Sequence, residues 1–329
     1  MIGIAAVIPT YNRGRMIGRA IESVLNQTVK PNQIIVVDDG SIDNTAAICA
    51  EYSQQHVEYV RQANAGVSQA RNHGIRLARH DWIAFLDSDD FWTPTHLERI
   101  TSAIEDTSGK ASFYFSDIRT FFGPNESTLW SKIGFKFDSP FLLTQNGTSW
   151  MLSSRQPSSI QCSVFKSTTL KASGGFDRRF QVMEDTELFC RLGIGGSICA
   201  VNNVGCVITA EDDRNNRLTA LVHCYTESYW NHACMLWDGL LSRFPDLVPP
   251  FRRAIRYNLA AGYWRLSRFY WRARRFRRGF VMLIKSAMVA PAFIFWLLRY
   301  RSSTGWEEYV LPTCRPVSCQ RGLNATQMP

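Results

Sequence analysis

The feature that most constrains this chain is the alternation of short apolar runs with helical patterns over its first hundred residues. The apolar runs predict strands at Ile2–Ile8, Ile34–Val37, Val57–Arg61 and Trp82–Leu86. Helical spacing of apolar residues predicts the intervening helices, at Met16–Gln27, Thr45–His56 and Val67–Ala78. Continuous apolar strands joined by helices are typical of a mostly parallel sheet covered on both faces, so we expect an α/β fold.

Polar residues follow three of these strands at the point where each strand ends. Pro9–Arg13 follow the first strand, Asp38–Ser41 the second and Asp87–Asp90 the fourth. Ligands of open α/β sheets bind beyond the carboxyl ends of the strands. The three segments are therefore expected to form one site.

Asp87 and Asp89 stand two residues apart directly after a buried strand, so both carboxylates can reach one cation. Mg²⁺ and Mn²⁺ prefer oxygen ligands, and magnesium shares its shell with substrate phosphates. The alternative is that the acidic run caps the following helix through Asp90 or Thr93. The D-x-D pattern alone is compatible with both interpretations.

Two further segments are compatible with nucleotide binding. Asp39 and Gly40 lie in a tight turn, where Asp39 could accept hydrogen bonds from a base or ribose, or could serve turn geometry alone. The helix that begins after Gly66 carries Arg71 one turn in, a position that suits a phosphate. The alternative there is an ordinary capped helix with a solvated arginine.

Glu184 and Asp185 begin another predicted helix, Asp185–Leu192. A carboxylate at this position could take a proton from a hydroxyl as a general base. Acidic residues are also common in a first helical turn, because they interact favourably with the helix dipole. The residues alone favour the second interpretation.

The net charge of +9 is concentrated in one part of the chain, because arginine and lysine crowd residues 252–301. The apolar run Phe280–Leu298 within it is interrupted by Lys285 and Pro291, which disfavours a membrane span. We expect a helical pair lying on an anionic membrane surface. The alternative is a helical appendage that packs its aromatic face on the rest of the protein. No nucleic-acid motif accompanies the charge, so nucleic acid is not an expected partner.

The nine cysteines are scattered and include no Cys-x-x-Cys pair. Such a set predicts reduced thiols in a cytoplasmic protein. The basic C-terminal region predicts that this protein lies peripherally at the inner face of the cell membrane. Residues 2–9 are apolar but lack a basic segment, so they are interpreted as a strand rather than a secretory leader.

Taken together, these segments resemble the family 2 glycosyltransferases, which have the GT-A fold. Each matching string is modest alone, but their joint order and spacing between Ile4 and Arg191 are very specific. The strings are Val7–Arg13, Val37–Ser41 with Asp43 and Thr45, Asn64–Gly66 with Ala70–Asn72, Phe85–Asp90 with Trp92, Gly174–Asp177, and Glu184 with Asp185.

The resemblance implies a nucleotide-sugar donor, usually a UDP-sugar, bound at the strand ends. Pro9, Thr10 and Tyr11 would line the nucleotide pocket, Asp39 would contact the base, and Arg71 would lie on the diphosphate side. Asp87 and Ser88 would also contact the donor. Asp87 and Asp89 would hold Mg²⁺ or Mn²⁺, which neutralises charge on the leaving diphosphate.

On the acceptor side, the resemblance assigns Asp185 as the general base for the acceptor hydroxyl. Attack opposite the leaving group would invert the anomeric carbon. Gly175 and Phe176 would shape the acceptor side, with Glu184 beside them. The acceptor would be a saccharide or a lipid-linked molecule, in the synthesis of cell-surface polysaccharide or glycolipid.

Many family members carry a histidine after the last sheet strand, but the corresponding stretch here, residues 211–219, has none. Arg214 or Arg217 could contact the diphosphate instead. The predicted organisation is a catalytic domain at 1–220 and a basic helical extension at 221–329. Within the catalytic domain, residues 1–110 form the nucleotide-sugar half and 111–220 the acceptor half.

Two other functions remain to be weighed. A non-catalytic protein that binds a nucleotide-sugar or carbohydrate on the same fold is the alternative, although Asp87, Asp89 and Asp185 are all present. An NAD-dependent enzyme is disfavoured, because no G-x-G-x-x-G follows the first strand.

Overall fold

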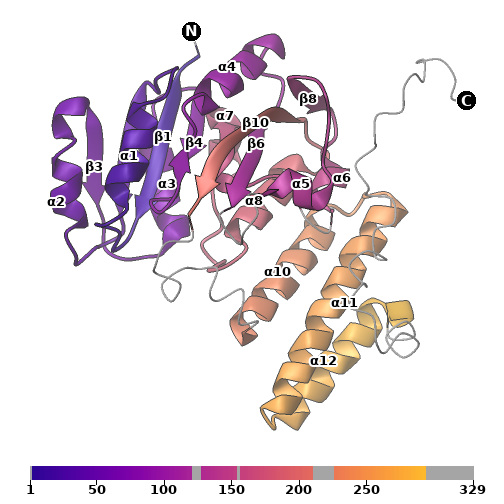
Figure 1. The fold of residues 1–329 in the computed structure, drawn as a ribbon. Helices are drawn as coiled ribbons and strands as arrows, with labels where there is room; N and C mark the ends of the chain where they lie inside the picture. The colour runs from indigo at the N-terminus through magenta and orange to yellow at the C-terminus, as the bar shows by residue number, and fades with distance from the viewer. Residues whose placement is uncertain (1, 121–126, 154–155, 210–225, 294–329) are drawn as a thin grey trace, which may run out of the picture.

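The computed structural model describes residues 2–120, 127–153, 156–209 and 226–293 (Figure 1). The first elements are β1 (Ile4–Thr10), α1 (Ile17–Leu25), β2 (Gln33–Asp38), α2 (Thr45–Ala50), β3 (Val57–Arg61), α3 (Val67–Leu77), β4 (Trp82–Phe85), β5 (Phe91–Trp92) and α4 (His96–Asp106). The predicted strands and helices of this region are confirmed. The predicted helix Thr45–His56 is shorter, because α2 ends at Ala50 and a 3₁₀ turn, Ser53–Gln55, follows.

The second part of the chain completes the sheet and adds a helical extension. Its sheet-associated elements are β6 (Phe113–Thr120), β7 (Ser127–Thr128), α5 (Leu129–Ile133), β8 (Phe141–Thr144), α6 (Thr148–Met151), β9 (Ser163–Lys166), α7 (Ser167–Ala172), α8 (Glu184–Gly193) and β10 (Ile198–Ile208). The extension consists of α10 (Glu227–Arg243), α11 (Pro249–Arg272) and α12 (Phe276–Val289).

One sheet runs through the protein in the order β3-β2-β1-β4-β9-β6-β10-β5, with β7 beside β6 and β8 beside β10. β1, β2, β3 and β4 are mutually parallel, whereas β9 is antiparallel to both β4 and β6. The α/β fold is confirmed, but the sheet is mixed rather than mostly parallel. The reason is that β9 starts at the edge where β4 ends and runs back across the sheet.

The core lies on both faces of this sheet. All seven residues of β1 are buried, and they alternate between the two faces. Ala5 and Val7 pack with side chains of α3, α7 and α8, whereas Ile4, Ala6 and Ile8 pack with α1 and α4. Burial on both faces explains why the strand is apolar throughout instead of alternating with polar residues.

The stretch Phe121–Ser159 is rich in Gly, Ser, Asn and aromatic residues, a composition that predicts loops. Its described residues nevertheless contain the short elements β7, α5, β8 and α6, the last three labelled in Figure 1. Tertiary contacts stabilise them where local propensity does not. Phe141 to Thr144 pair with one side of β10, and Thr128 caps α5 by accepting a hydrogen bond from the Ser131 amide. The apolar residues of Ile160–Phe165 predict a further strand. The observed strand β9 starts only at Ser163, because Ile160–Cys162 form a 3₁₀ turn.

The three C-terminal helices confirm the expected helical extension, and Pro249 and Pro250 begin α11 at positions where proline is tolerated. Leu236, Leu240 and Ile255 belong to the same buried cluster as the sheet's α3–α8 face, so α10 and the start of α11 pack on the sheet domain. The rest of α11 forms a hairpin with α12 that projects away from the sheet (Figure 1). The predicted domain boundary near residue 220 lies outside the described residues.

Among the described helices, none combines the length and the apolar character needed to cross a membrane. The six cysteines in the described residues are all free and buried: Cys49, Cys162, Cys190, Cys199, Cys206 and Cys234.

Candidate active site

The register of the parallel strands brings three strand ends to one edge of the sheet. Thr10 pairs with Asp38 between β1 and β2, and Val7 pairs with Phe85 between β1 and β4. The polar segments that follow β1, β2 and β4 therefore start next to one another. The sequence prediction that these segments share one edge is confirmed.

The turn after β1 is held by the turn after β2. The Asn12 amide donates to Ser41 Oγ (2.8 Å), and the Ile42 amide donates to Asn12 Oδ1 (2.9 Å). Asn12 has a φ of 51°, a left-handed conformation that asparagine tolerates better than most residues. Pro9 and Thr10 are buried at the end of β1, whereas the Tyr11 side chain is exposed at the edge.

Asp39 is buried at the end of β2 and organises the segment before α3. Its Oδ1 accepts from Gln62 Nε2 (2.7 Å) and from the Ala65 amide (2.9 Å), and its Oδ2 accepts from the Gly66 amide (2.7 Å). Gly40, with a φ of 85°, lets the backbone pass closely over this segment. The contact of Asp39 with a base stays a prediction, and any such contact would share oxygens that already accept hydrogen bonds.

Arg71 links the two acidic segments of the site. Its Nη2 donates to Asp87 Oδ1 (2.7 Å) and its Nη1 donates to Glu184 Oε1 (2.9 Å). The guanidinium lies over the Phe176 ring, 5.2 Å from its centroid, and only 3% of the side chain is exposed. The solvated arginine offered as an alternative is therefore wrong, because Arg71 is buried between two carboxylates that raise its pKa. The position of Arg71 on the diphosphate side of the donor stays a prediction.

Asp87 is engaged on both oxygens. Besides the bond from Arg71, its Oδ2 accepts from Gln161 Nε2 (2.8 Å), which comes from the 3₁₀ turn before β9. About a quarter of the side chain, 24%, remains exposed. The adjacent Ser88 is buried. Asp87 is thus held in one orientation at the edge of the sheet.

Asp89 and Asp90 point into different surroundings. Asp89 Oδ2 lies 4.0 Å from Arg13 Nε, and 19% of the Asp89 side chain is exposed. Asp90 is buried, and its Oδ1 accepts from the Thr209 amide (3.3 Å) beyond β10. Thr93 Oγ1 donates to the Val204 carbonyl (2.7 Å). Capping of α4 by Asp90 or Thr93 is therefore wrong, because both side chains bind the β10 segment.

The N-terminus of α8 places two carboxylates beside Arg71. Met183 precedes the helix with a φ of 65°, a strained conformation for a residue with a long side chain. Glu184 is buried, and this burial, together with the neighbouring Asp185 carboxylate, raises the pKa of Glu184 to about 7 against the opposing effect of Arg71. Asp185 is half-buried, and its Oδ1 accepts from the Thr186 amide (2.6 Å).

Gly175 and Phe176 form a turn that is locked to α3 and α8. Asn72 donates to the Phe176 carbonyl (2.8 Å) and accepts from the Phe176 amide (2.8 Å). Arg191 donates to the carbonyls of Gly175 (2.6 Å) and Ser173 (2.8 Å). Phe176 itself is buried, so its ring supports Arg71 from below and does not line an open pocket.

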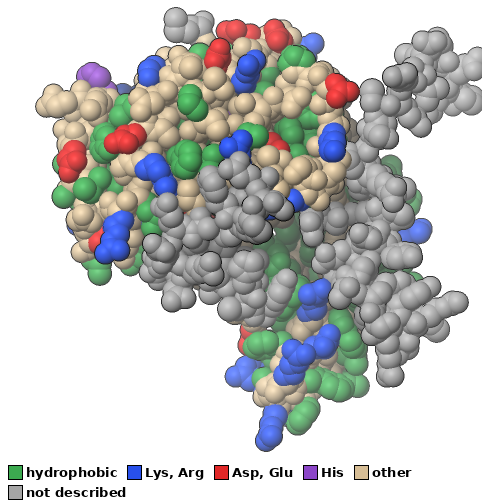
Figure 2. Space-filling model, in the orientation of Figure 1, with side chains coloured by type: hydrophobic (Ala, Val, Ile, Leu, Met, Phe, Trp, Pro, Cys, Tyr) green, Lys and Arg blue, Asp and Glu red, His purple; other side chains and the backbone are tan. Residues whose placement is uncertain are grey.

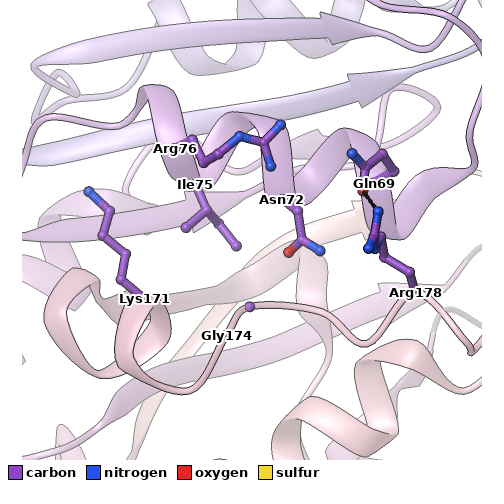
Figure 3. A pocket seen from close by; sticks show the side chains of 8 residues that line it. Gln69, Asn72, Ile75, Arg76, Lys171, Gly174 and Arg178 are labelled. Atoms are coloured by element: carbon purple, nitrogen blue, oxygen red, sulfur yellow. Dashed lines mark hydrogen bonds between the residues drawn. The ribbon is translucent and has the colours of Figure 1, made fainter.

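A groove of about 620 Å³ runs beside this turn, between α3 and the segment after α7 (Figure 3). Asn72 and Gly175 form part of its floor, and three cationic side chains line it: Arg76, Lys171 and Arg178. Figure 3 shows the α3 side chains facing Lys171 and Arg178 across the groove. The groove gives the Gly175 side of the site a positive rim.

Three positioning residues have no role in the sequence interpretation: Gln161, Asn72 and Arg191. Asn72 belongs to a matching string, but nothing in the sequence shows that it binds the backbone of Phe176 a hundred residues later. Arg191 stands four residues after Glu187, a spacing that predicts the ion pair seen between them (2.7 Å). No sequence pattern around Gln161 predicts its hydrogen bond to Asp87. The diphosphate contacts suggested for Arg214 and Arg217 lie outside the described residues.

The donor set of the acidic run fits a hard divalent cation. Asp87 and Asp89 offer carboxylate oxygens at a partly exposed edge, which is the ligand type that magnesium and manganese take. In the part of the chain that the structure describes, no three His, Cys, Asp or Glu side chains gather as a group that could hold a metal ion. A cation held by these aspartates would take its remaining ligands from water and from substrate phosphates.

The mixed sheet, the acidic residues at its edge and the carboxylates of α8 together define an α/β domain with one acidic site at the strand ends. Residues 5–153 match the model of glycosyl transferase family 2. The resemblance found in the sequence is thus confirmed over residues 5–153, a little under half of the chain, and the fold is the GT-A fold.

Individual relatives support this assignment. Chondroitin synthase of Escherichia coli is 28% identical over 208 residues, which cover 61% of this chain and 28% of that protein. The matches to the first curated relatives cover only 28% to 37% of their own length.

Two solved structures share the fold. Staphylococcus aureus TarS 1–349 in complex with UDP-GlcNAc has a TM-score of 0.61 at 19% identity, covering 82% of this chain and 73% of that one. The mannosyltransferase PcManGT of Pyrobaculum calidifontis in complex with GDP-Man and Mn²⁺ has a TM-score of 0.55 at 17% identity, covering 94% and 84%.

Proposed function

We propose that this protein transfers a sugar from a nucleotide-sugar, a UDP-sugar in the first instance, to a hydroxyl of a saccharide or lipid-linked acceptor. The observation that carries the proposal is the bridge made by Arg71. It holds the D-x-D segment at Asp87 and the carboxylate pair of α8 at Glu184, 2.7 and 2.9 Å from one guanidinium. The proposed donor-binding edge and the proposed base would thereby lie next to each other.

The donor would lie across the ends of β1, β2 and β4. Exposed Tyr11 is available to stack on a base, while buried Pro9 and Thr10 support it. Asp39 and Ser88 complete this side of the proposed pocket. TarS was solved with UDP-GlcNAc and PcManGT with GDP-Man, so both nucleotides enter the test below.

Asp87 and Asp89 would hold a divalent cation, Mg²⁺ or Mn²⁺, on the donor. When bound, such a cation neutralises negative charge that develops on the leaving diphosphate. PcManGT was solved with Mn²⁺, which supports manganese as the first metal to test. Asp87 already accepts hydrogen bonds from Arg71 and Gln161, so a cation held there would share this carboxylate with protein donors.

Asp185 would act as the general base. Its carboxylate takes the proton of the acceptor hydroxyl while that oxygen attacks the anomeric carbon. The bond between the anomeric carbon and the diphosphate oxygen breaks, and the electron pair leaves with the nucleoside diphosphate. A single displacement from the opposite face inverts the anomeric configuration. The Gly175–Phe176 turn, fixed by Asn72 and Arg191, would border the acceptor, with Glu184 beside the base.

A thermal-shift screen tests the binding half of this proposal. UDP-, GDP- and dTDP-sugars are compared with and without manganese, and we expect one of them to raise the melting temperature in a metal-dependent way. Slow hydrolysis of that donor then separates a transferase from a non-catalytic protein that only binds it. Absence of a shift with every nucleotide contradicts the proposed donor site.

The acceptor remains to be identified among saccharides and lipid-linked molecules of cell-surface polysaccharide or glycolipid synthesis. A panel of such acceptors, assayed with the donor found above, tests this part. A lipid-linked acceptor would require the protein to work at the inner face of a membrane, which calls for a surface that can bind one.

A further inference from the structure

The outward face of α12 is apolar and exposed. Phe276, Phe280, Ile284 and Met288 recur every four residues, and Val281 lies beside them. Between 43% and 76% of each residue is exposed. These five residues, here called the α12 stripe, include three of the four large hydrophobic residues most accessible to solvent in the described chain. Contiguous exposed apolar residues of this kind mark contact surfaces in folded proteins.

The stripe faces away from the rest of the protein because the opposite side of α12 is bound to α11. Ser286 Oγ donates to the Ala260 carbonyl (2.8 Å), and Ser267 Oγ donates to the Gly279 carbonyl (2.7 Å). Ser286 and Gly279 are buried. α12 thus packs on α11 through small residues and through the partly buried Met282 and Val289, while the stripe remains exposed to solvent.

A cluster of arginines lies at the end of the same hairpin. Arg274, Arg275, Arg277 and Arg278, here called the arginine turn, line a hollow of about 570 Å³ together with Phe276. Figure 2 shows basic and hydrophobic side chains side by side over α11 and α12, at the end of the molecule away from the sheet.

Only part of this positive charge is balanced within the protein. Arg275 Nη1 lies 3.6 Å from Glu227 Oε2, and Arg278 lies over the Tyr270 ring, 5.9 Å from its centroid. Among the described residues, Glu227 is the only carboxylate that forms an ion pair with an arginine of this turn. The turn therefore carries a net positive charge directly beside the apolar stripe.

We propose that the α11–α12 hairpin binds the surface of an anionic lipid bilayer. The α12 stripe enters the boundary between headgroups and acyl chains, and the arginine turn receives lipid phosphates in its hollow. A bilayer surface is the partner that offers apolar and anionic chemistry in one plane, matching the apolar and cationic residues that adjoin on this hairpin. The three-helix extension thereby acquires a role separate from packing on the sheet domain.

This proposal deepens the proposed function. Only the biological role of membrane binding rests on the lipid-linked acceptor proposed above. The binding itself is measured without donor, metal or acceptor. Failure of lipid binding and failure of sugar transfer are therefore distinguishable.

The experiment is flotation of the full-length protein with vesicles of phosphatidylcholine alone or with 30 mol% phosphatidylglycerol, the latter fraction chosen at roughly the anionic content of a charged leaflet. We expect flotation with the anionic vesicles and loss of it in high salt. R274Q/R277Q should weaken partitioning about 30-fold, since two basic contacts are lost. F280S/M288S should weaken it at least about tenfold.

Matched controls fix the interpretation. R79Q/R99Q removes two exposed arginines from the sheet domain, and I42S removes an exposed apolar residue there, so both should float like the unmodified protein. Equal loss in R79Q/R99Q and R274Q/R277Q overturns the proposal, because the binding is then due to net charge alone. Equal flotation with neutral vesicles overturns the anionic part. Light scattering that shows a dimer dissociated by F280S/M288S, with no flotation, assigns the stripe to a second copy and also overturns it.

Discussion

Replacement of Arg71 by methionine tests the bridge on which the proposed site depends. Methionine keeps much of the side-chain length but removes the guanidinium that donates to Asp87 and Glu184. Asp87 keeps Gln161 as a hydrogen-bond donor and is partly exposed, so removing Arg71 costs little stabilisation at Asp87. Glu184 is buried, and Arg71 is the one side chain that donates to it among the described residues.

The cost of this change depends on pH, and its sign follows from the pKa of Glu184. Burial and Asp185 raise this pKa to about 7, so below pH 7 the folded protein carries a proton on Glu184. A raised carboxyl pKa means that stability falls as pH rises from the unfolded value, about 4.3, to the folded value. Without Arg71 the folded pKa of Glu184 rises further. The free energy of unfolding of R71M therefore continues to fall above pH 7, whereas that of the unmodified protein stops falling there.

We therefore expect R71M to lose roughly 1–3 kcal/mol of unfolding free energy at pH 6, where Glu184 is protonated and the change removes hydrogen bonds rather than an ion pair with Glu184. Above pH 7 the loss should grow by about 1.4 kcal/mol per pH unit, the value of one unit of pKa. Urea unfolding at pH 6, 7 and 8 measures both quantities. In R71M/E184Q the growth should disappear, since glutamine does not ionise.

The control is R79M, which breaks an exposed pair with Glu58 and should cost less than about 1 kcal/mol at every pH. A loss in R71M that is the same at pH 6 and pH 8 refutes the reasoning, because Glu184 is then not the group left without a partner.

Four other changes test separate parts of the site. D185N should keep donor-induced thermal stabilisation but lower transfer at least about 100-fold in a radiolabelled-sugar assay; full transfer would remove Asp185 as the base. D89A should abolish the metal-dependent part of the donor's thermal shift, and an unchanged manganese response would exclude Asp89 as a ligand. G175A should lower the unfolding free energy by about 1–3 kcal/mol, since its Cβ would lie 2.3 Å from Asn72 Oδ1 at a φ of 70°; S173A, which keeps the backbone, is the comparison in the same unfolding assay. L236A should cost about 2–5 kcal/mol if α10 shares the core of the sheet domain, and a loss below about 1 kcal/mol would contradict that packing.

The sequence predicts the donor half of the fold well because each strand there is short, apolar and buried on both faces. β10 is a strand that the sequence pattern does not predict. It is the strand that pairs with β5, β6 and β8, yet its register shifts between Val201 and Val204 and again before Cys206. Asn202 and Asn203 interrupt the apolar run at that place. A bulged strand of this kind has neither strict alternation nor a continuous apolar run, so its pattern does not predict a strand.

Arg71 could have been placed from the sequence by a stricter use of helical spacing. Ala70, Gly74 and Ile75 are buried on α3, and Arg71 lies in the same stripe at positions separated by three and four residues. An arginine inside an apolar stripe predicts a buried ion pair rather than a solvated charge. Its partners could not be predicted, because Glu184 is 113 residues away and only the tertiary fold brings it within 2.9 Å.

The carboxylates of the site divide according to how many of their oxygens the protein already uses. Asp39 and Asp87 accept hydrogen bonds from protein groups on both oxygens. A carboxylate in that condition is fixed in position, although its two oxygens offer about four lone-pair sites in all. These two residues therefore shape the edge of the sheet, through the segment before α3 and through Arg71.

Asp185 differs from them in a way that supports its proposed chemistry. Its Oδ1 accepts from the Thr186 amide and hydroxyl, but its Oδ2 accepts no hydrogen bond from the described residues. One oxygen thus sets the orientation of the side chain while the other can receive a proton. The fold orients Asp39 and Asp87 through hydrogen bonds to both of their oxygens. At the N-terminus of α8 it instead leaves a half-buried, oriented carboxylate, as a general base for an acceptor hydroxyl requires.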